Sequence, residues 1–373
     1  MRSQALKSFL AIVITFTASA FTAVFILSPG TIPNLSVSQR FLRSHISVPA
    51  AISAILNPTN LPSIAPTTLS SLNGSYQPVY LINEPAICST GLNSTSHNTF
   101  SSPFLLIYIH TKPSHFHRRA FLRHTWADPY FKARFNYSTV FILGDPQNVT
   151  VQQKILNESQ TFHDIVQADF RDVYENLTLK EISGLHWTTS YCSHTTFVIK
   201  ADDDLIIKPW FLFEILQKYS NVSSKPSIYC RKWEKQGPHR NKQSKWYVPY
   251  SVFPGKVYPP FCSGPSRIMT KSAVQLLFNG TQKLPFFWLE DVFVTGIVAE
   301  YMGVERYNEP LFLEDVVARF NAIGSDNLKV AVAHSYGLSN QRRLWKAVTE
   351  KFPGYFTGRN LTSFDDGFLD DGE

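Results

Sequence analysis

The sequence Thr196-Phe-Val-Ile-Lys-Ala-Asp-Asp-Asp-Leu-Ile-Ile207 places three adjacent carboxylates between two apolar runs. Carboxylates this close repel and raise one another's pKa, so a folded chain accommodates them best at its surface or around a cation. Their oxygens are suitable ligands for Mn²⁺ or Mg²⁺, which in turn bind phosphate oxygens. In an extended chain Asp202 and Asp204 point the same way and Asp203 points the other way. The alternative is a solvated turn that joins two strands.

Apolar runs around this segment predict an α/β fold. Three continuous runs suit strands that are covered on both faces: 104–109, 139–143 and 197–199. Further elements are a helix at 177–191, a helix at 209–219 that begins with Pro209, and a strand at 227–230. Strands that alternate with helices predict a largely parallel sheet, and ligands of such sheets bind beyond the carboxyl ends of the strands.

A second acidic pair stands in Phe287-Trp-Leu-Glu-Asp-Val-Phe293. Glu290 and Asp291 are surrounded by aromatic and aliphatic residues. A carboxylate in an apolar pocket has a raised pKa and can act as a general base. The alternative is a helix N-terminus, where acids interact favourably with the helix dipole.

The segment 245–264 is rich in proline and aromatic residues, which predicts a loop region. Aromatic faces stack on the C–H surfaces of sugars, so Trp246, Tyr258 and Phe261 are candidates for binding a glycan acceptor. Plain packing of these rings is the alternative.

The N-terminal region predicts a membrane anchor and a stem. Residues 9–27 carry no charge and are long enough to span a hydrocarbon core of about 30 Å. Arg2 and Lys7 precede them, which predicts a cytoplasmic tail at 1–8 and a lumenal remainder. A cleaved signal peptide is the alternative. Residues 28–100 are rich in Ser, Thr, Pro and Asn and predict a flexible stem, which leaves 101–373 as the catalytic domain.

Sequons and cysteines are consistent with an oxidising, secretory compartment. Asn-x-Ser/Thr stands at Asn34, Asn73, Asn93, Asn136, Asn148, Asn157, Asn176, Asn221, Asn279 and Asn360. Some of these sequons should lie in regular structure and stay unused, and Asn176 is the first of them that we expect to be unused. Cys88, Cys192, Cys230 and Cys262 can form two disulfides in three pairings or stay as buried thiols.

The overall composition leaves several partner classes open. The chain of 373 residues is 44% hydrophobic and 17% charged, with a formal net charge of +7. A basic balance favours an anionic partner such as a nucleotide diphosphate or a membrane surface. Nucleic acid is disfavoured because no dense block of Lys and Arg occurs.

Six blocks, in order, resemble the β1,3-glycosyltransferase family that includes β1,3-galactosyltransferases and β1,3-N-acetylglucosaminyltransferases, known as glycosyltransferase family 31. The resemblance covers roughly residues 104–337. The blocks are Arg119-Ala-Phe-Leu-Arg-His-Thr-Trp126, Phe141-Ile-Leu-Gly144, residues 158–180, Lys200-Ala-Asp-Asp-Asp204, Tyr258-Pro-Pro-Phe-Cys-Ser-Gly264 and Glu290-Asp-Val-Phe293.

The resemblance implies a GT-A type nucleotide-sugar-binding fold and an inverting transfer from a UDP-sugar to a glycan acceptor in the Golgi. It implies that Asp204 ligates Mn²⁺, with Asp202 and Asp203 near the metal and the donor, and that Asp291 is the base. His334 is a candidate second metal ligand. The remaining residues that it implies are Arg119, Arg123, Trp126 and Lys200 on the donor side and Glu290 on the acceptor side.

The chain departs from the family pattern at Pro265-Ser-Arg267, where many members have Thr-Gly-Tyr, and at Gly296, which falls one place late. Neither change removes an acidic residue. The expected function is therefore a UDP-sugar-dependent β1,3-hexosyltransferase, with galactose as the expected sugar. The alternatives are a non-catalytic, membrane-anchored glycan-binding protein of the same fold and a metal-dependent phosphohydrolase.

Overall fold

The computed structural model describes residues 75–88, 104–220, 225–310, 312–313, 330–335 and 337–357. Within these ranges no helix is long and apolar enough to cross a membrane. The predicted cytoplasmic tail at 1–8 and anchor at 9–27 lie outside them.

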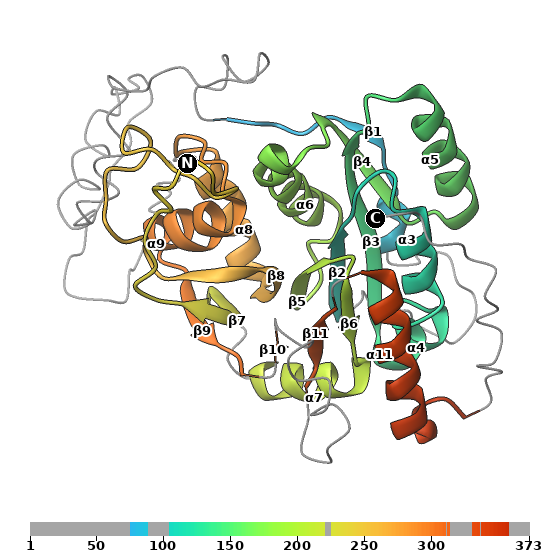
Figure 1. Cartoon of the computed structure of the whole chain (residues 1–373). Helices are drawn as coiled ribbons and strands as arrows, with labels where there is room; N and C mark the ends of the chain where they lie inside the picture. Colours follow the sequence, from blue (N-terminus) through green and yellow to red (C-terminus); the bar gives the residue numbers. More distant parts are fainter. Residues whose placement is uncertain are drawn as a thin grey trace, which may run out of the picture. The chain divides into compact units, whose positions relative to one another are not determined.

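The elements alternate along the chain much as the apolar runs predict, and they are labelled as in Figure 1. The strands are β1 (Tyr80–Ile82), β2 (Leu105–His110), β3 (Tyr137–Asp145), β4 (Ile165–Arg171), β5 (Phe197–Asp202), β6 (Leu205–Ile207), β7 (Ser227–Trp233), β8 (Phe261–Thr270), β9 (Glu305–Asn308), β10 (Phe312–Leu313) and β11 (Val332–His334). The α-helices are α3 (Phe116–Arg123), α4 (Pro129–Phe135), α5 (Val149–Phe162), α6 (Leu177–Tyr191), α7 (Pro209–Tyr219), α8 (Lys271–Thr281), α9 (Ala299–Met302) and α11 (Leu338–Lys351). Short 3₁₀ turns lie at Pro85–Cys88, Tyr174–Asn176 and Pro353–Tyr355, and Val292–Val298 is π-helical.

An eight-stranded sheet forms the centre, in the order β1-β4-β3-β2-β5-β8-β7-β9. Strands β4, β3, β2 and β5 run parallel, whereas β8 pairs antiparallel with both β5 and β7. The register places His110 opposite Asp202, so β2 and β5 end at the same edge. A second sheet of β10, β11 and β6 lies beside this edge and pairs His334 with Leu205. The expected α/β class with a largely parallel core is confirmed.

Each face of the large sheet packs against its own hydrophobic core. Residues of α3, α4, α5, α7, α11 and the small sheet pack on one face, with Ile107 and Ile109 of β2. Residues of α6, α8, α9 and the π-helix pack on the other face, with Leu106 and Tyr108. Every residue of β2 is buried, which explains its unbroken apolar run.

Strand β8 differs from the sequence analysis, which treats Phe261 to Gly264 as part of a loop. Between the paired segments of β7 and β8 the register shifts, and Pro265 lies in this irregular stretch. A proline lacks the N–H that a regular ladder needs, and an irregularity of this kind accommodates it. The bulge also breaks the alternation of side chains, so the strand carries no clear sequence pattern.

The domain also begins earlier than residue 101. Strand β1 lies within the segment expected to be stem, yet it pairs antiparallel with β4 at the edge of the sheet. The following turn ends at Cys88, which forms a disulfide with Cys192 at the end of α6. A second disulfide joins Cys230 of β7 to Cys262 of β8. These two bonds select one of the three possible pairings, and none of the four cysteines is free.

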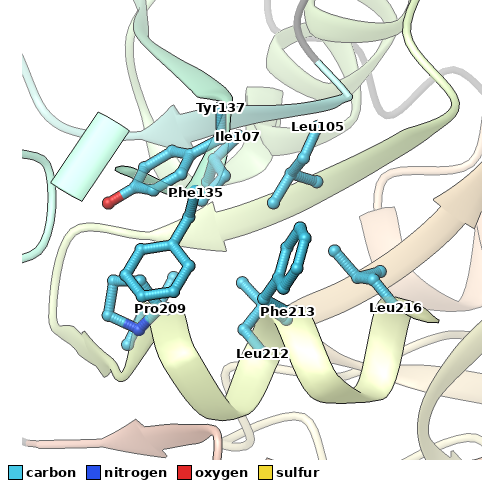
Figure 2. A pocket seen from close by; sticks show the side chains of 9 residues that line it. Leu105, Ile107, Phe135, Tyr137, Pro209, Leu212, Phe213 and Leu216 are labelled. Carbon is cyan, nitrogen blue, oxygen red and sulfur yellow. The ribbon is translucent and has the colours of Figure 1, made fainter. Parts of the chain in front are cut away.

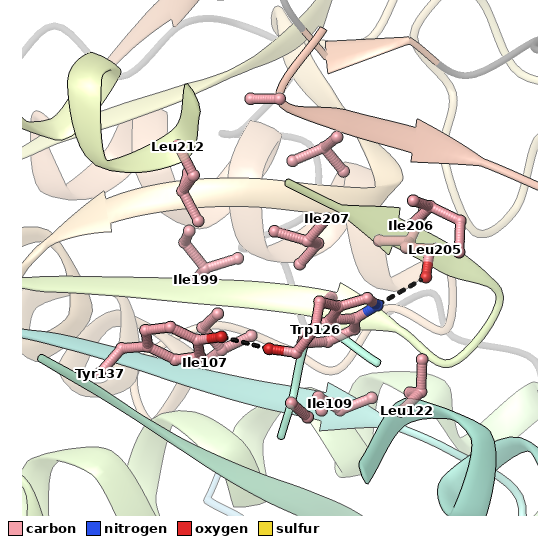
Figure 3. Close-up of a cluster of buried hydrophobic side chains, with 14 of the residues drawn as sticks. Ile107, Ile109, Leu122, Trp126, Tyr137, Ile199, Leu205, Ile206, Ile207 and Leu212 are labelled. Carbon is pink, nitrogen blue, oxygen red and sulfur yellow. Dashed lines mark hydrogen bonds between the residues drawn. The ribbon is translucent and has the colours of Figure 1, made fainter. Parts of the chain in front are cut away.

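A small pocket between α7 and the adjoining ends of β2 and β3 belongs to the core (Figure 2). Its lining is apolar and consists of Leu105, Ile107, Phe135, Tyr137, Ile207, Pro209, Leu212, Phe213 and Leu216. The Tyr137 hydroxyl donates to the carbonyl of Trp126 (Figure 3). With no carboxylate or cation in its lining, this pocket has no means of binding a nucleotide diphosphate.

Candidate active site

The three aspartates form the tight connection between β5 and β6. Asp202 ends β5, and Asp203 and Asp204 form the turn. The side chain of Asp203 is 7% exposed, whereas those of Asp202 and Asp204 are 34% and 22% exposed. The alternation expected from the sequence therefore agrees with the structure: one carboxylate is directed into the protein and two face outward.

Asp203 attaches this turn to the loop after β2 and to α3. Its carboxylate accepts hydrogen bonds from Thr111 Oγ1 at 2.5 Å and from Arg118 Nη1 at 3.2 Å, and lies 2.7 Å from His115 Nδ1. Burial by itself would raise the pKa of Asp203, but His115, Arg118 and Thr111 outweigh burial and lower the pKa to about 2. Asp203 is an ionised structural group, and its side chain is not directed outward toward a ligand.

Asp204 is paired with His334, the residue that the family resemblance makes a candidate second metal ligand. His334 Nε2 lies 3.0 Å from Asp204 Oδ2. The β6–β11 pairing and the bonds from the Ser335 backbone N–H and hydroxyl to the Asp204 carbonyl bring the two residues together across a long stretch of sequence. Asp204 Oδ1 is buried and has no hydrogen-bond partner among the described residues.

Asp202 is linked to β8 through a buried lysine. The Lys200 ammonium donates to Asp202 Oδ1 and, at 2.6 Å, to the carbonyl of Gly264. Partial burial, together with the charge of Asp204, raises the pKa of Asp202 to about 6 despite the Lys200 charge. Lys200 therefore joins the acidic turn to the segment on the opposite side of the site.

Asp291 lies across this site, at the start of the π-helix. Its Oδ1 accepts a hydrogen bond from the backbone N–H of Val292 at 2.8 Å. Its Oδ2 faces Gly264, where an added Cβ would lie only 3.8 Å from it. Burial raises the pKa of Asp291, although the Val292 N–H and the charges of Arg267 and Lys200 oppose this effect. A partly exposed carboxylate of raised basicity is suited to accept a proton.

Glu290 belongs to a buried charge network that the sequence analysis missed. The fully buried guanidinium of Arg267 lies between Glu290 and Glu181, with Nη2 2.5 Å from Glu181 Oε1. Tyr108 also donates to Glu181 Oε1, at 2.7 Å. Burial raises the pKa of Glu290 to about 7, against the charge of Arg267. Glu181 also lies in the interior, but Arg267 and His110 outweigh burial and keep its pKa below the usual range.

Arg119, Arg123 and Trp126 lie behind the site. Arg119 is fully buried, pairs with Glu158 and donates to the carbonyls of Lys112 and Pro113. Arg123 pairs with Glu158 and Asp164. Trp126 is fully buried and donates from Nε1 to the carbonyl of Leu205 at 3.0 Å (Figure 3). Their position supports the loop after β2 and strand β6, while a direct contact with a donor stays a prediction.

Of the predicted acceptor residues, Trp246 alone is exposed, at 42%. Tyr258 and Phe261 are buried in the core around the π-helix, and Glu290 is held by Arg267. The exposed Tyr174, which accepts a hydrogen bond from Trp246 Nε1 at 3.0 Å, was not among the predicted site residues. Its signal in the sequence is weak, because it lies 72 positions from Trp246.

The residues present fit a divalent cation, although the described ranges contain no cluster of three or more His, Cys, Asp or Glu side chains that could hold one. The Asp204–His334 pair and the unpartnered Asp204 Oδ1 supply two donors at one point. Mn²⁺ or Mg²⁺ in diphosphate-binding sites takes only one or two protein carboxylates and fills its other positions with phosphate and water.

Known proteins resemble the chain over most of this domain. Residues 117–310 match the family described as Galactosyltransferase. The chain is 30% identical over 278 residues to beta-1,3-galactosyltransferase 1 of Homo sapiens and of Mus musculus, which covers 73% of this chain and 79% of either relative. The chain belongs to the galactosyltransferase family.

Other relatives of this galactosyltransferase-family chain match over shorter or more divergent ranges. Beta-1,3-galactosyltransferase 2 of Homo sapiens is 32% identical over 238 residues, or 63% of this chain and 54% of that protein. A solved glycosyltransferase involved in glycosylation of the PBCV-1 major capsid is 10% identical and covers 66% of this chain and 100% of that chain, with a TM-score of 0.35. Family membership agrees with the GT-A type expected from the sequence and supports a glycosyltransferase.

Proposed function

We propose that this chain is an inverting β1,3-galactosyltransferase, which transfers galactose from UDP-galactose to a glycan acceptor on a glycoprotein or glycolipid. The observation that carries the proposal is the approach of Asp291 to Gly264, whose carbonyl accepts the bond from Lys200, the partner of Asp202. Asp291, the proposed proton acceptor, thereby lies opposite the acidic turn with Asp202 and Asp204, which suits a cation that binds a diphosphate. Both lie where the parallel strands end. The names of the relatives support galactose as the sugar.

Each residue has a distinct part in this proposal. Asp291 Oδ2 accepts the proton of the acceptor hydroxyl, whose oxygen attacks the anomeric carbon from the face opposite UDP. The new bond forms as the bond to UDP breaks, so the configuration inverts without a covalent intermediate. Asp204 and His334 would hold Mn²⁺, which stabilises negative charge on a diphosphate leaving group. Lys200 keeps Asp202 in place, and Asp203 fixes the turn that presents both outer carboxylates.

The proposed setting is the lumenal side of the Golgi membrane, with residues 9–27 as the anchor. Two disulfides support an oxidising compartment, and the exposed sequon residues Asn136, Asn157 and Asn279 support passage through the secretory pathway.

The deciding experiment measures release of UDP by the full-length chain with Mn²⁺. UDP-galactose, UDP-N-acetylglucosamine and UDP-N-acetylgalactosamine are each supplied with a panel of glycan acceptors. We expect acceptor-dependent release from UDP-galactose that EDTA abolishes.

The variant Asp291→Asn tests the base directly. We expect turnover to fall by about 10²-fold or more while the affinity for UDP is kept, because an amide cannot accept the proton. The matched control is Glu214→Gln on the exposed face of α7, which should keep full activity. Full turnover by Asp291→Asn would refute the assignment. Metal-dependent binding of UDP without transfer from any donor would indicate the non-catalytic glycan-binding protein instead.

A further inference from the structure

The connection between β7 and β8 concentrates the positive charge of the chain. Residues 231–256 contain seven Lys or Arg and one acid, Glu234, a formal charge of +6 against +7 for the whole chain. Arg240 organises this connection: its guanidinium donates to the carbonyls of Val248, Phe253 and Gly255 at 2.6, 2.7 and 3.0 Å. The loop, drawn in yellow in Figure 1, is therefore held together by its own bonds.

Exposed aromatic side chains form a platform next to this loop. Trp246 and Tyr174 are 42% and 44% exposed, although a hydrogen bond joins them. The ring of Tyr174 also meets Trp288 edge-on, with the centroids 6.3 Å apart. We call Tyr174, Trp246 and Trp288 the aromatic platform. Large aromatic faces left open to water beside a polar site are the surfaces on which the C–H faces of sugars stack.

The aromatic platform is fixed beside Asp291. Trp288 precedes Asp291 by three residues, and Thr178 Oγ1 donates to the carbonyls of Phe287 and Trp288 at 2.9 and 3.1 Å. These bonds attach the segment to the first turn of α6, which follows the 3₁₀ turn that begins at Tyr174. Burial raises the pKa of Tyr174, and the charges of Asp291, Glu290 and Asp202 raise it further, in agreement with this proximity.

The side chain of Lys245 lies against two rings of the aromatic platform. Lys245 Nζ lies 4.7 Å from the ring centroid of Trp246 and 5.7 Å from that of Tyr174. Lys245 is exposed and forms no ion pair with a carboxylate within the described part of the chain. The Lys245 ammonium is therefore held by the faces of two rings. No carboxylate of the described part of the chain neutralises its charge, which lies at the aromatic platform beside Asp291.

We infer that the aromatic platform binds an acceptor glycan that carries a negative charge, either a sulfate or a carboxylate, with Lys245 as the residue that recognises it. This inference rests on the proposed transferase function and names its acceptor class. The platform rings bind the sugar face, Lys245 binds the anionic substituent, and the remaining positive charge of residues 231–256 attracts such acceptors over a longer range.

The test uses the full-length chain and acceptors in matched pairs. N-acetyllactosamine is compared with its 6-sulfated form, and a disaccharide that ends in a uronic acid is compared with its methyl ester. KM and kcat are measured for the wild type, Lys245→Gln, Trp246→Ala and the control Lys242→Gln, an exposed lysine of the same loop.

We expect the KM of one anionic acceptor to be about threefold or more below that of its neutral twin, as suits a partly exposed ion pair. Lys245→Gln should remove this difference, and Lys242→Gln should keep it. Trp246→Ala should raise KM for charged and neutral acceptors alike by about tenfold, as loss of a central aromatic contact does. The pair that shows the difference distinguishes sulfate from carboxylate.

Equal KM values within both pairs, or a preference that persists in Lys245→Gln, would overturn the inference while transfer itself upheld the proposed function. If no acceptor is used at all, the proposed function fails, and binding of the same saccharides is measured by saturation-transfer NMR. Preferential binding of an anionic saccharide that is lost in Lys245→Gln would then uphold the anionic site, and equal binding would overturn it.

Discussion

At the scale of single residues, the three aspartates of one motif have three different environments. Asp202 contacts Lys200, Asp203 is enclosed by donors from the loop after β2 and from α3, and Asp204 lies against His334. The sequence shows the acids and the alternation between them. The donors of Asp203 precede it by 85 to 92 positions, so no local pattern could reveal them.

Replacement of His334 tests the proposed metal position. We expect His334→Gln to weaken Mn²⁺-dependent binding of UDP by at least about tenfold, because a ligand of the cation is lost. Binding of UDP without Mn²⁺ should stay unchanged. Titration calorimetry of UDP with and without Mn²⁺ measures both. The exposed His163 provides the control His163→Gln, and equal Mn²⁺ dependence in the two variants would exclude His334 as a ligand.

The low pKa of Asp203 predicts how its contribution to stability depends on pH. Because the folded-state pKa is lowered from 3.8 to about 2, the ionised group stabilises the fold above pH 3.8, and the contribution is lost as pH falls toward 2. Asp203→Asn should lower the free energy of unfolding by about 2 kcal/mol at pH 7. The free energies of unfolding of the wild type and of Asp203→Asn, measured with urea, should converge as pH falls from 7 to 3. A gap that is as wide at pH 3 as at pH 7 would contradict this account, and Glu214→Gln is the control.

Arg267 shows where a departure from a family pattern acquires a physical meaning. Arg267 is one of the departures from the family pattern, and its partners Glu181 and Glu290 are not its neighbours in the sequence. In the structure its guanidinium is fully buried between Glu181 of α6 and Glu290, next to the proposed base. A buried charge of this kind needs its counter-charges, because leaving one member unpaired costs about 3–5 kcal/mol. Arg267 is therefore part of the buried core behind the site, although it departs from the family pattern.

At the scale of elements, the sequence predicts best where burial is uniform. The helix expected at 177–191 has those limits, and the apolar runs locate β2, β3 and β5. Strand β4 and helices α3 to α5 have mixed surfaces and were not assigned, although family blocks overlap α3, α5 and β4. Strand β1 is only three residues long and lies in a Ser- and Pro-rich region, so the sequence gives no local pattern for it. Its place at the sheet edge is set by its pairing with β4.

The junction of α6 with the acidic segment has a testable effect on activity. Thr178 is fully buried, and its hydroxyl bonds two carbonyls just before Glu290 and Asp291. Thr178→Val keeps the shape but leaves those carbonyls unsatisfied, so we expect stability to fall by about 1–3 kcal/mol. We also expect kcat to fall, because the bond positions the segment of the base. Thermal unfolding and steady-state kinetics measure the two effects.

The matched control is Thr188→Val in the same helix, since that hydroxyl bonds the carbonyl of Gly184 within α6. It should have little effect on kcat. An equal loss of kcat in both variants would mean that α6 acts through general stability and does not position Asp291.

At the scale of the whole molecule, the elements that form the site come from distant parts of the chain. The β5–β6 turn, β11 and the start of the π-helix meet because parallel strands end at one edge and because the small sheet brings His334 to Leu205. The order of the acidic blocks in the sequence predicts that a site exists. Its composition, including Tyr174 beside Trp246, depends on long-range packing that a single sequence does not encode locally.

The same packing decides which sequons a folded molecule can carry. Asn176 is 8% exposed, and its side-chain nitrogen donates to the carbonyl of Arg171 at 2.9 Å. Because this nitrogen is buried at the start of α6, a glycan attached to it would have no room there, whereas Asn157 and Asn279 are exposed. In active protein purified from a secretory host, glycopeptide mass spectrometry should find Asn176 bare and at least one exposed site occupied. An occupied Asn176 in the active fraction would show that the start of α6 is arranged differently in solution, and the aromatic platform with it.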